Sequence, residues 1–206
     1  MEDKDYLKLI VEELHTSVMA TVDENGYPVT AAIDIMDYDD ESLYFLTARG
    51  KSLYTRLKNN GHLAITLMKG TDTMHTLAVS VKGCAEEIGP DRLPELFEKN
   101  PYMYEIYRNE ESRRALTVFR IYEGTGEWFS MDGGNIEHAS FRIGDAAPEE
   151  EGYFITDACT GCESCLAVCP RGVISLETGS AVIDQAHCIR CGNCREACPA
   201  GAVIPR

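Results

Sequence analysis

The sequence lacks several features that would each have pointed to a function. It has no run near the ~18 apolar residues that a membrane-spanning helix requires, so we expect no membrane partner. Its 19 basic residues are outnumbered by 34 acidic ones, which gives a formal net charge of −15. Such a chain repels nucleic acid, so we expect no nucleic-acid partner. The negative charge fits either simple solubility or docking to a basic redox protein.

Two nucleotide-binding patterns are also missing. No G-x-G-x-x-G occurs, so the sequence shows no nicotinamide-binding fingerprint. Gly50-Lys51-Ser52 ends like a phosphate-binding P-loop, but the position of that motif's first glycine is Phe45, inside an apolar run. This excludes an ATPase loop and leaves room for another phosphate at the same place. The N-terminus is acidic and amphipathic, unlike a signal peptide, which predicts a cytoplasmic protein.

Cysteine is the residue that the sequence has in excess. There are nine, and eight lie in the last 48 residues, in two runs that each read C-x2-C-x2-C-x3-C-P. The runs are 29 residues apart at every cysteine, which indicates an internal duplication. Zinc sites and a disulfide scaffold are the alternatives, but zinc sites usually use two C-x-x-C pairs. The spacing favours iron–sulfur ligation, and a module this small needs its metal to fold.

Residues 152–206 resemble the bacterial two-cluster ferredoxins through these two runs. The resemblance implies two [4Fe–4S] clusters, and in that arrangement the fourth cysteine of each run ligates the other cluster. One cluster would then be held by Cys159, Cys162, Cys165 and Cys198. The other would be held by Cys188, Cys191, Cys194 and Cys169. Cys84, far from these runs, is predicted to be a buried small apolar residue.

The remaining sequence alternates like an antiparallel barrel with short helices. An amphipathic helix is expected over residues 3–14, and Asn25-Gly26 predicts a hairpin between the first two strands. Further strands are predicted at 28–36, 42–47, 63–68, 77–86, 116–123 and 127–131. Helices are predicted after Gly50 as far as the stop at Gly61, near 91–99 and around 103–115. The fold class is therefore mostly β with α, a split β-barrel followed by a small α+β ferredoxin-like domain.

The order of these pieces resembles the FMN-binding split barrel of the pyridoxamine 5′-phosphate oxidase family over about residues 5–143. We therefore expect an FMN domain at 1–145 and a ferredoxin domain at 152–206. The resemblance implies FMN phosphate contacts at Thr47, Arg49, Lys51 and Ser52, with the flavin ring along Thr30, Ala31 and Ala32. It also implies a homodimer. Trp128 and Phe129 are expected in the core or the dimer contact, with Trp128 as a residue that can approach the partner's flavin.

The sequence departs from that family in ways that limit what carries over. Ser52-Leu53 stand where vitamin B6 oxidases have an Arg-Lys pair, and neither their flavin-contacting glutamine nor their arginine-rich end is visible. Vitamin B6 oxidation is therefore not expected. Some split barrels bind haem or a deazaflavin, and His62, His75 and His138 are the formal haem ligands here.

The short seam at 144–153, which contains Pro148, ties the two halves together. Flavins accept one or two electrons, so a flavin can convert single electrons from the clusters into hydride-like transfers. One hypothesis is a cytoplasmic flavin- and iron–sulfur-dependent oxidoreductase of an anaerobic metabolism, with a small organic acceptor or a redox protein as partner. The other is a non-catalytic electron carrier, a tethered ferredoxin whose barrel only docks flavin. The sequence names no catalytic residue.

Overall fold

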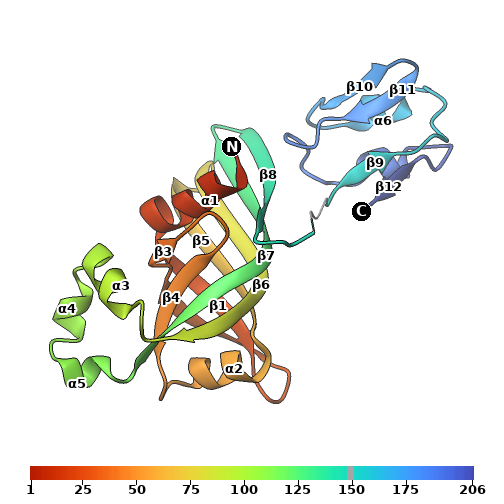
Figure 1. Ribbon diagram of the computed structural model, residues 1–206. Coiled ribbons are helices and arrows are strands. Elements are labelled where there is room, and N and C mark those ends of the chain that lie inside the picture. Colours follow the sequence, from red (N-terminus) through yellow and green to blue (C-terminus); the bar gives the residue numbers. More distant parts are fainter. Residues whose placement is uncertain (148–150) are drawn as a thin grey trace. The chain divides into compact units, whose positions relative to one another are not determined.

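The computed structural model describes residues 1–147 and 151–206, which form two compact units (Figure 1). The first unit contains Met1–Lys69, Leu77–Trp128 and the segment that starts at Phe141. The second contains Gly70–Thr76, Phe129–Ser140 and the C-terminal module that ends at Arg206. Pro148, in the expected linker, lies outside the described residues. Each unit is described by itself below.

The barrel is one antiparallel sheet whose strand order is β2-β1-β5-β6-β7-β4-β3, with β8 paired to β7. Its strands are β1 Thr16–Val22, β2 Pro28–Asp34, β3 Asp37–Tyr38, β4 Leu43–Ala48, β5 His62–Asp72, β6 His75–Gly89, β7 Leu116–Asp132 and β8 Asn135–Ile143. The predicted hairpin at Asn25-Gly26 joins β1 to β2, because Gly26 has φ +84° and Val22 pairs with Pro28. This mostly-β barrel is the predicted architecture.

The prediction of two strands at 116–123 and 127–131 is wrong, because β7 runs unbroken for 17 residues. Gly124 and Gly126, in the predicted break between these two strands, serve close packing within the sheet. A Cβ on Gly124 would collide with the backbone of Lys82 and Gly83 on β6. A Cβ on Gly126 would collide with the ring of Phe141, on the neighbouring strand β8.

Helices cover the open parts of the barrel. The predicted helix 3–14 is an α-helix at α1 Asp3–Leu9 and a π-helical turn at Ile10–Leu14, which ends at His15. Helix α2 Ser52–Asn60 lies across one end of the barrel and stops at Gly61, with φ +67°, as predicted (Figure 1). Three short helices between β6 and β7 form the insert: α3 Leu93–Lys99, α4 Met103–Ile106 and α5 Glu110–Arg113.

The core of the first unit is built from large apolar side chains. Phe45 and Phe119 face each other inside the barrel with ring centroids 5.5 Å apart, and both are fully buried. A second cluster joins the insert to the sheet, with Leu96, Phe97 and Met103 packed against residues that include Leu116. No helix in the described parts of the chain is long and apolar enough to cross a bilayer.

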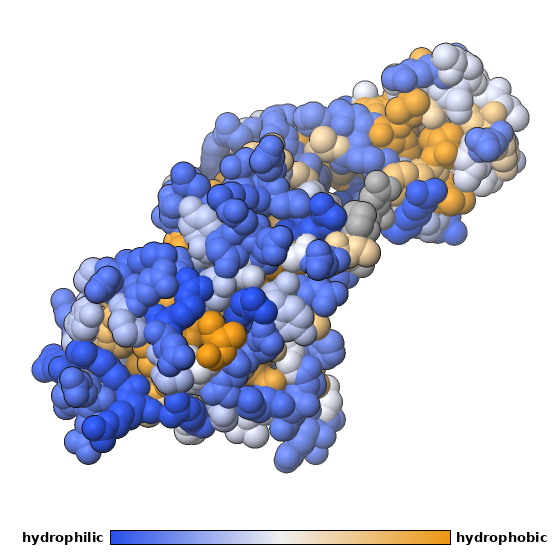
Figure 2. All heavy atoms as spheres, in the orientation of Figure 1, coloured by the Kyte–Doolittle hydropathy of each residue, from blue (hydrophilic) through white to orange (hydrophobic). Residues whose placement is uncertain are grey.

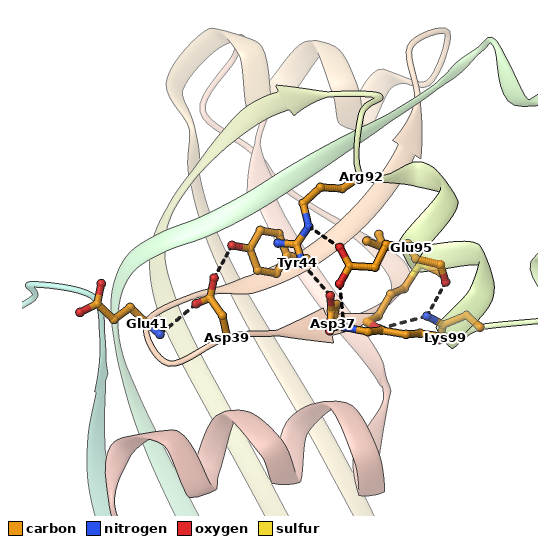
Figure 3. Close-up of polar contacts among 10 residues, drawn as sticks. Asp37, Asp39, Glu41, Tyr44, Arg92, Glu95 and Lys99 are labelled. Carbon is orange, nitrogen blue, oxygen red and sulfur yellow. Dashed lines mark hydrogen bonds and ion pairs between the residues drawn. The ribbon is translucent and has the colours of Figure 1, made fainter.

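A polar network fastens helix α3 to the sheet (Figure 3). The buried carboxylate of Asp37 accepts from Arg92 at 2.8 Å and from Lys99 at 2.8 Å. Arg92 also lies 3.8 Å over the ring of Tyr44, and Glu95 bonds both cations. This buried anchor holds one side of α3 firmly against β3 and β4.

The C-terminal module of the second unit is small and has little apolar mass. Strand β9 Tyr153–Ile155 pairs with β12 Val203–Pro205, and β10 Ile174–Glu177 pairs with β11 Ser180–Ile183. Two short helices, α6 Ser164–Val168 and α7 Asn193–Glu196, repeat in the two halves. Figure 2 shows apolar side chains gathered on the visible face of this module. Its buried cluster contains the cysteines Cys165, Cys188 and Cys194 beside a few aliphatic residues.

Candidate functional site

The eight C-terminal cysteines gather around two cavities in the second unit. One cavity is lined by Cys159, Cys162, Cys165 and Cys198. The other is lined by Cys169, Cys188, Cys191 and Cys194. Each cavity therefore takes three cysteines from one run and the last cysteine of the other run. These are the two groupings that the ferredoxin resemblance implies.

The local backbone aims hydrogen bonds at the sulfur atoms. The amides of Ala181 and Ala202 donate to Cys159 Sγ at 3.4 Å and to Cys198 Sγ at 3.3 Å. Such bonds, first of all from Ala181, lower the pKa of Cys159, since they favour the thiolate. Burial raises the pKa of Cys165. Thiolates are the form that ligates metal, so the amides prepare this module for a negatively charged cluster.

The arrangement of the cysteines can be checked for disulfide bonds and for a site that holds a single metal ion. All nine are free thiols, so the structure contains no disulfide scaffold. Among residues 1–147 and 151–206, no three His, Cys, Asp or Glu side chains come close enough to hold a single metal ion.

The start of helix α2 offers a second kind of site in the first unit. Lys51 is the N-cap residue, and no side chain caps the helix there, so the first amides of Ser52 and its neighbours are open. The exposed Lys51 ammonium has no hydrogen bond or ion pair to any residue that the structure describes. A lysine, a hydroxyl and a nine-residue helix N-terminus fit a phosphate group.

Glu87 on β6 holds this loop and helix in place. Its carboxylate accepts from Tyr54 at 3.1 Å and Thr117 at 2.7 Å, and it pairs with Lys58 at 3.0 Å. Burial alone would raise the pKa of Glu87, but these bonds outweigh it and lower the pKa below its ordinary value. Glu87 therefore acts as a charged anchor for α2.

Helix α2 is also tied to the hairpin that was predicted to carry the flavin ring. One helical turn after Ser52, Arg56 lies against β1, where its Nε donates to Thr21 Oγ1 at 2.7 Å. Thr21 pairs with Val29 on β2, next to Thr30. The start of α2 and the Thr30 end of β2 thus lie at the same end of the barrel. Thr30, Ala31 and Ala32 pair with Ala20, Met19 and Val18, which gives this strand a surface of small side chains.

The other two residues predicted at the phosphate are Thr47, which is buried, and Arg49, which is already hydrogen-bonded. Thr47 is only 2% exposed, and its buried Oγ1 has no hydrogen-bond partner among the described residues. A buried hydroxyl without a partner is expected to bond to a ligand or a water molecule. Arg49 is already engaged, because its guanidinium donates to the carbonyl of Arg114 at 2.8 Å.

A hydrogen-bonded group of His15, Tyr102 and Asp34 was missed in the sequence. The Tyr102 hydroxyl donates to Asp34 Oδ2 at 2.8 Å, so the 2.9 Å bond from His15 makes its Nε2 the donor. Burial, and then the bond to Asp34, raise the pKa of Tyr102. His15 has φ +58°, an unusual backbone for a residue other than glycine. Asp34 lies two residues beyond Ala32 on β2, so this group lies at the far end of the predicted ring strand.

The three histidines considered as haem ligands and the single tryptophan each make their own contacts. His62 Nδ1 lies 3.4 Å from Cys84 Sγ, so Cys84 is a half-buried partner of histidine and not the buried apolar residue that we predicted. His75 bonds Asp72, and His138 contacts the ring of Phe129. Trp128 lies 6.4 Å from Tyr6, measured between ring centroids.

Comparison with known proteins gives a match for each half of the sequence. The family profile described as "Pyridoxamine 5'-phosphate oxidase" matches residues 4–131. The profile described as "4Fe-4S dicluster domain" matches residues 152–199. Among curated proteins, one polypeptide of the anaerobic dimethyl sulfoxide reductase of Escherichia coli K12 is 35% identical over 86 residues. That match covers 40% of this chain and 37% of the reductase polypeptide.

An iron–sulfur subunit of the CoB–CoM heterodisulfide reductase of Methanocaldococcus jannaschii is 39% identical over 69 residues, 25% of this chain and 10% of that subunit. The chain thus spans little more than a third, or less, of these two relatives. A NimC/NimA family protein from Clostridium acetobutylicum has a TM-score of 0.56 at 17% identity and covers 68% of this chain and 92% of its own. A protein related to general stress protein 26 from the same organism has a TM-score of 0.52 at 19% identity, with coverage of 68% and 96%. At such identities the two structures support the barrel fold alone.

Proposed function

Because this protein belongs to the pyridoxamine 5′-phosphate oxidase family and ends in a 4Fe–4S dicluster domain, we propose that it is an FMN- and iron–sulfur-dependent oxidoreductase. It passes electrons between two [4Fe–4S] clusters and FMN, to or from a small organic acceptor. The observation that carries this proposal is the fusion of a flavin-type barrel with two groups of four cysteines in one polypeptide. When bound, FMN supplies the exchange between one-electron and two-electron steps.

The crossed ligation of the clusters is part of this proposal. Cys159, Cys162, Cys165 and Cys198 would hold one cluster, and Cys169, Cys188, Cys191 and Cys194 the other. The two cysteine-lined cavities support it, since each of them brings together one of these sets. The amide bond to Cys159 lowers the pKa of that thiol and so favours the thiolate form that such a cluster needs.

The proposed FMN site joins the start of α2 to strand β2. Lys51 and Ser52 would hold the phosphate, with Thr47 and Arg49 nearby, and the ring would lie along Thr30, Ala31 and Ala32. The uncapped helix N-terminus and the unpaired Lys51 support the phosphate contact. The anchors Glu87 and Thr21 support a preformed site, because they fix α2 relative to the strands.

The His15–Tyr102–Asp34 group favours an enzyme over a simple carrier. Reduction of an organic acceptor takes protons as well as electrons, and a positioned side chain speeds such a transfer. His15 and Tyr102 are hydrogen-bonded to each other and, through Tyr102, to Asp34, which lies two residues along β2 from Ala32, so they are able to hold such a proton.

A homodimer is proposed from the outer face of the sheet. Val18 and Met68 are 57% and 71% exposed on neighbouring strands β1 and β5. Val18 pairs with Thr66, two residues before Met68, and the next pair on this face joins Ala20 to Ala64. An exposed apolar face of a sheet fits a second copy of the chain. Sedimentation of wild type and Val18→Glu tests this: the wild type should be a dimer and the variant largely a monomer. Equal masses for the two would contradict the proposed interface.

The oxidoreductase proposal is tested by composition and turnover together. Anaerobically purified protein should contain about eight iron, about eight sulfide and one FMN per chain, as two [4Fe–4S] clusters and one flavin require. With a reduced ferredoxin as donor, a panel of organic acceptors should give steady turnover. Full cofactors without turnover on any acceptor would favour the electron-carrier function, and zinc in place of iron would overturn the cluster assignment.

A further inference from the structure

A hollow in the first unit is left unexplained by the redox proposal. It has a volume of about 480 Å³, within the range of small-molecule sites. The insert forms most of it, with the loop after β4 at its edge. Its apolar wall is formed by Leu93, Phe97 and Tyr104 together with two prolines.

Three arginines from separate parts of the sequence line the same hollow: Arg49, Arg113 and Arg114. The lining contains a single carboxylate, Glu110. This concentration of positive charge is unexpected in a chain with a formal net charge of −15. Three guanidinium groups and one carboxylate give the lining a net positive charge, which attracts an anion.

The arginines differ in how firmly they are held. Arg113 is fixed, because its Nε donates to the carbonyl of Tyr107 at 2.8 Å and its guanidinium lies 4.7 Å from the centre of the Tyr104 ring. Arg49 donates to the carbonyl of Arg114 at 2.8 Å, which spans the edge of the hollow. The Arg114 guanidinium has no hydrogen bond or ion pair to the residues that the structure describes. It is therefore a planar donor available to a ligand.

The hollow is preformed rather than a gap between loose helices. The Asp37 network holds α3 on the sheet (Figure 3), while Leu93 and Phe97 of the same helix face the hollow. Phe97 is buried and lies 5.1 Å from Tyr104 in an edge-on contact, which fixes the aromatic part of the wall. A fixed apolar wall beside these guanidinium groups can recognise a ligand that has both an apolar body and an anionic group.

We propose that this hollow binds a small organic carboxylate with an aromatic body, an aryl carboxylate in chemical class. The carboxylate pairs with Arg114 and Arg113, because a guanidinium matches a carboxylate with two parallel bonds. The ring packs on Leu93, the two prolines and the exposed part of Tyr104. Inorganic phosphate offers the charge without the apolar body, so it binds more weakly.

The test is calorimetric titration of the purified, cofactor-loaded full-length protein with benzoate, benzyl alcohol and inorganic phosphate. Benzoate should bind, and benzyl alcohol and phosphate should each bind at least about fivefold more weakly, because each lacks one of the two recognised parts. Absence of benzoate binding, or phosphate binding as tight as that of benzoate, overturns the proposal.

Two arginine variants separate the site from general charge. Arg114→Gln should weaken benzoate binding by about fivefold or more, while it leaves the fold intact because the Arg114 guanidinium has no described partner and its backbone bonds are unchanged. Arg108→Gln removes the same charge from the same insert outside the hollow, since Arg108 bonds the carbonyl of Glu105. It should leave benzoate affinity unchanged. An equal effect of the two variants means that net charge alone acts, which overturns the site.

A third variant separates this hollow from the proposed flavin phosphate site. Lys51 and Ser52 do not line the hollow, although Arg49 does. Lys51→Glu should therefore leave benzoate affinity unchanged, and in protein from which the flavin has been removed, added FMN should not displace benzoate. Displacement of benzoate by FMN identifies the hollow as part of the flavin site and contradicts a separate aryl carboxylate site.

Discussion

The barrel and the C-terminal module are held together by different means. Inside the barrel, Phe45, Phe119 and other large side chains are fully buried, and the core is complete without any cofactor. In the module, three of the seven residues in the buried cluster are cysteines, and the rest are aliphatic. We therefore expect the barrel to draw its stability from apolar burial and the module to depend on the clusters proposed for its cysteines.

Removal of iron should separate the two halves most clearly. We expect a chelator under mildly acidic conditions to unfold the module and leave the barrel folded, because the module loses its core. Hydrogen exchange should show loss of protection at β9 to β12. The single tryptophan, Trp128, reports on the barrel through its contact with Tyr6 and should keep its emission wavelength. If β9 to β12 stayed protected from hydrogen exchange without iron, the module would not depend on its clusters for stability.

A single cysteine replacement should divide the module itself. Cys198→Ala should abolish the cluster of the Cys159 cavity and leave the other, so that iron falls from about eight to about four per chain. Cys169→Ala should do the reverse, and Cys84→Ala should leave iron unchanged. Iron analysis with electron paramagnetic resonance of the reduced protein checks this. Loss of the opposite cluster in each variant would show that the fourth ligands are not crossed.

Within the barrel, the largest polar effect should come from Asp37. Asp37→Asn leaves Arg92 and Lys99 without their buried counter-charge, so the free energy of unfolding should fall by about 2 kcal/mol. Urea titration followed by Trp128 fluorescence measures it. Asp40→Asn is the control, because Asp40 pairs with Lys4 on the surface and should change stability by less than about 0.5 kcal/mol. Equal losses in the two variants would show that Asp37 is not an anchor.

A smaller effect is expected on ligand binding at the start of α2. Lys51→Glu reverses a charge beside the proposed FMN phosphate, so flavin affinity should weaken at least about tenfold, or ~1.4 kcal/mol. Barrel stability without flavin should not change, since Lys51 has no described partner. Lys8→Glu makes the same change on α1 and should leave affinity as it is. Fluorescence titration with FMN measures the flavin affinity of each variant. Unchanged affinity in Lys51→Glu would show that Lys51 is not part of the flavin site.

The smallest effect concerns pH and Glu87. The pKa of Glu87 is lower in the folded state than its ordinary value of 4.5, mainly because its hydrogen bonds outweigh the cost of burial. Its contribution to stability is therefore complete above that value and is lost as the pH falls through the lower, folded pKa. The difference in unfolding free energy between wild type and Glu87→Gln should shrink as the pH falls below about 4.5. A difference that stays constant down to pH ~3 would contradict this anchor role.

How far the sequence could predict these features depends on how local they are. The eight cysteines lie in two short runs, so spacing alone indicated their chemistry, and the resemblance it carries implied their grouping. The hairpin at Asn25-Gly26 and the helix stop at Gly61 were likewise readable from neighbouring residues. By contrast, the break predicted between residues 123 and 127 was wrong. The close approach of β6 and Phe141 that Gly124 and Gly126 permit is made by residues distant in the sequence.

The two features that the sequence did not predict, the His15–Tyr102–Asp34 group and the arginine-lined hollow, also join residues that are distant in the sequence. Tyr102 is 87 residues from His15 and 68 from Asp34, and no local pattern connects them. The arginine-lined hollow joins Arg49 to an insert more than forty positions later. Only the path of the backbone brings these groups together, so a single sequence offered no signal for them.

The most direct test of the whole account is the route by which electrons reach the flavin. The measurement is stopped-flow bleaching of the flavin band at about 450 nm, with a reduced ferredoxin as donor. It compares the wild type with a full-length variant that carries Cys162→Ala and Cys191→Ala, one change in each proposed cluster. Both proteins should hold equal flavin and be reduced alike by dithionite. The account predicts a fast bleaching phase in the wild type that the variant lacks. Equal rates in the two proteins would show that the clusters are not the route to the flavin.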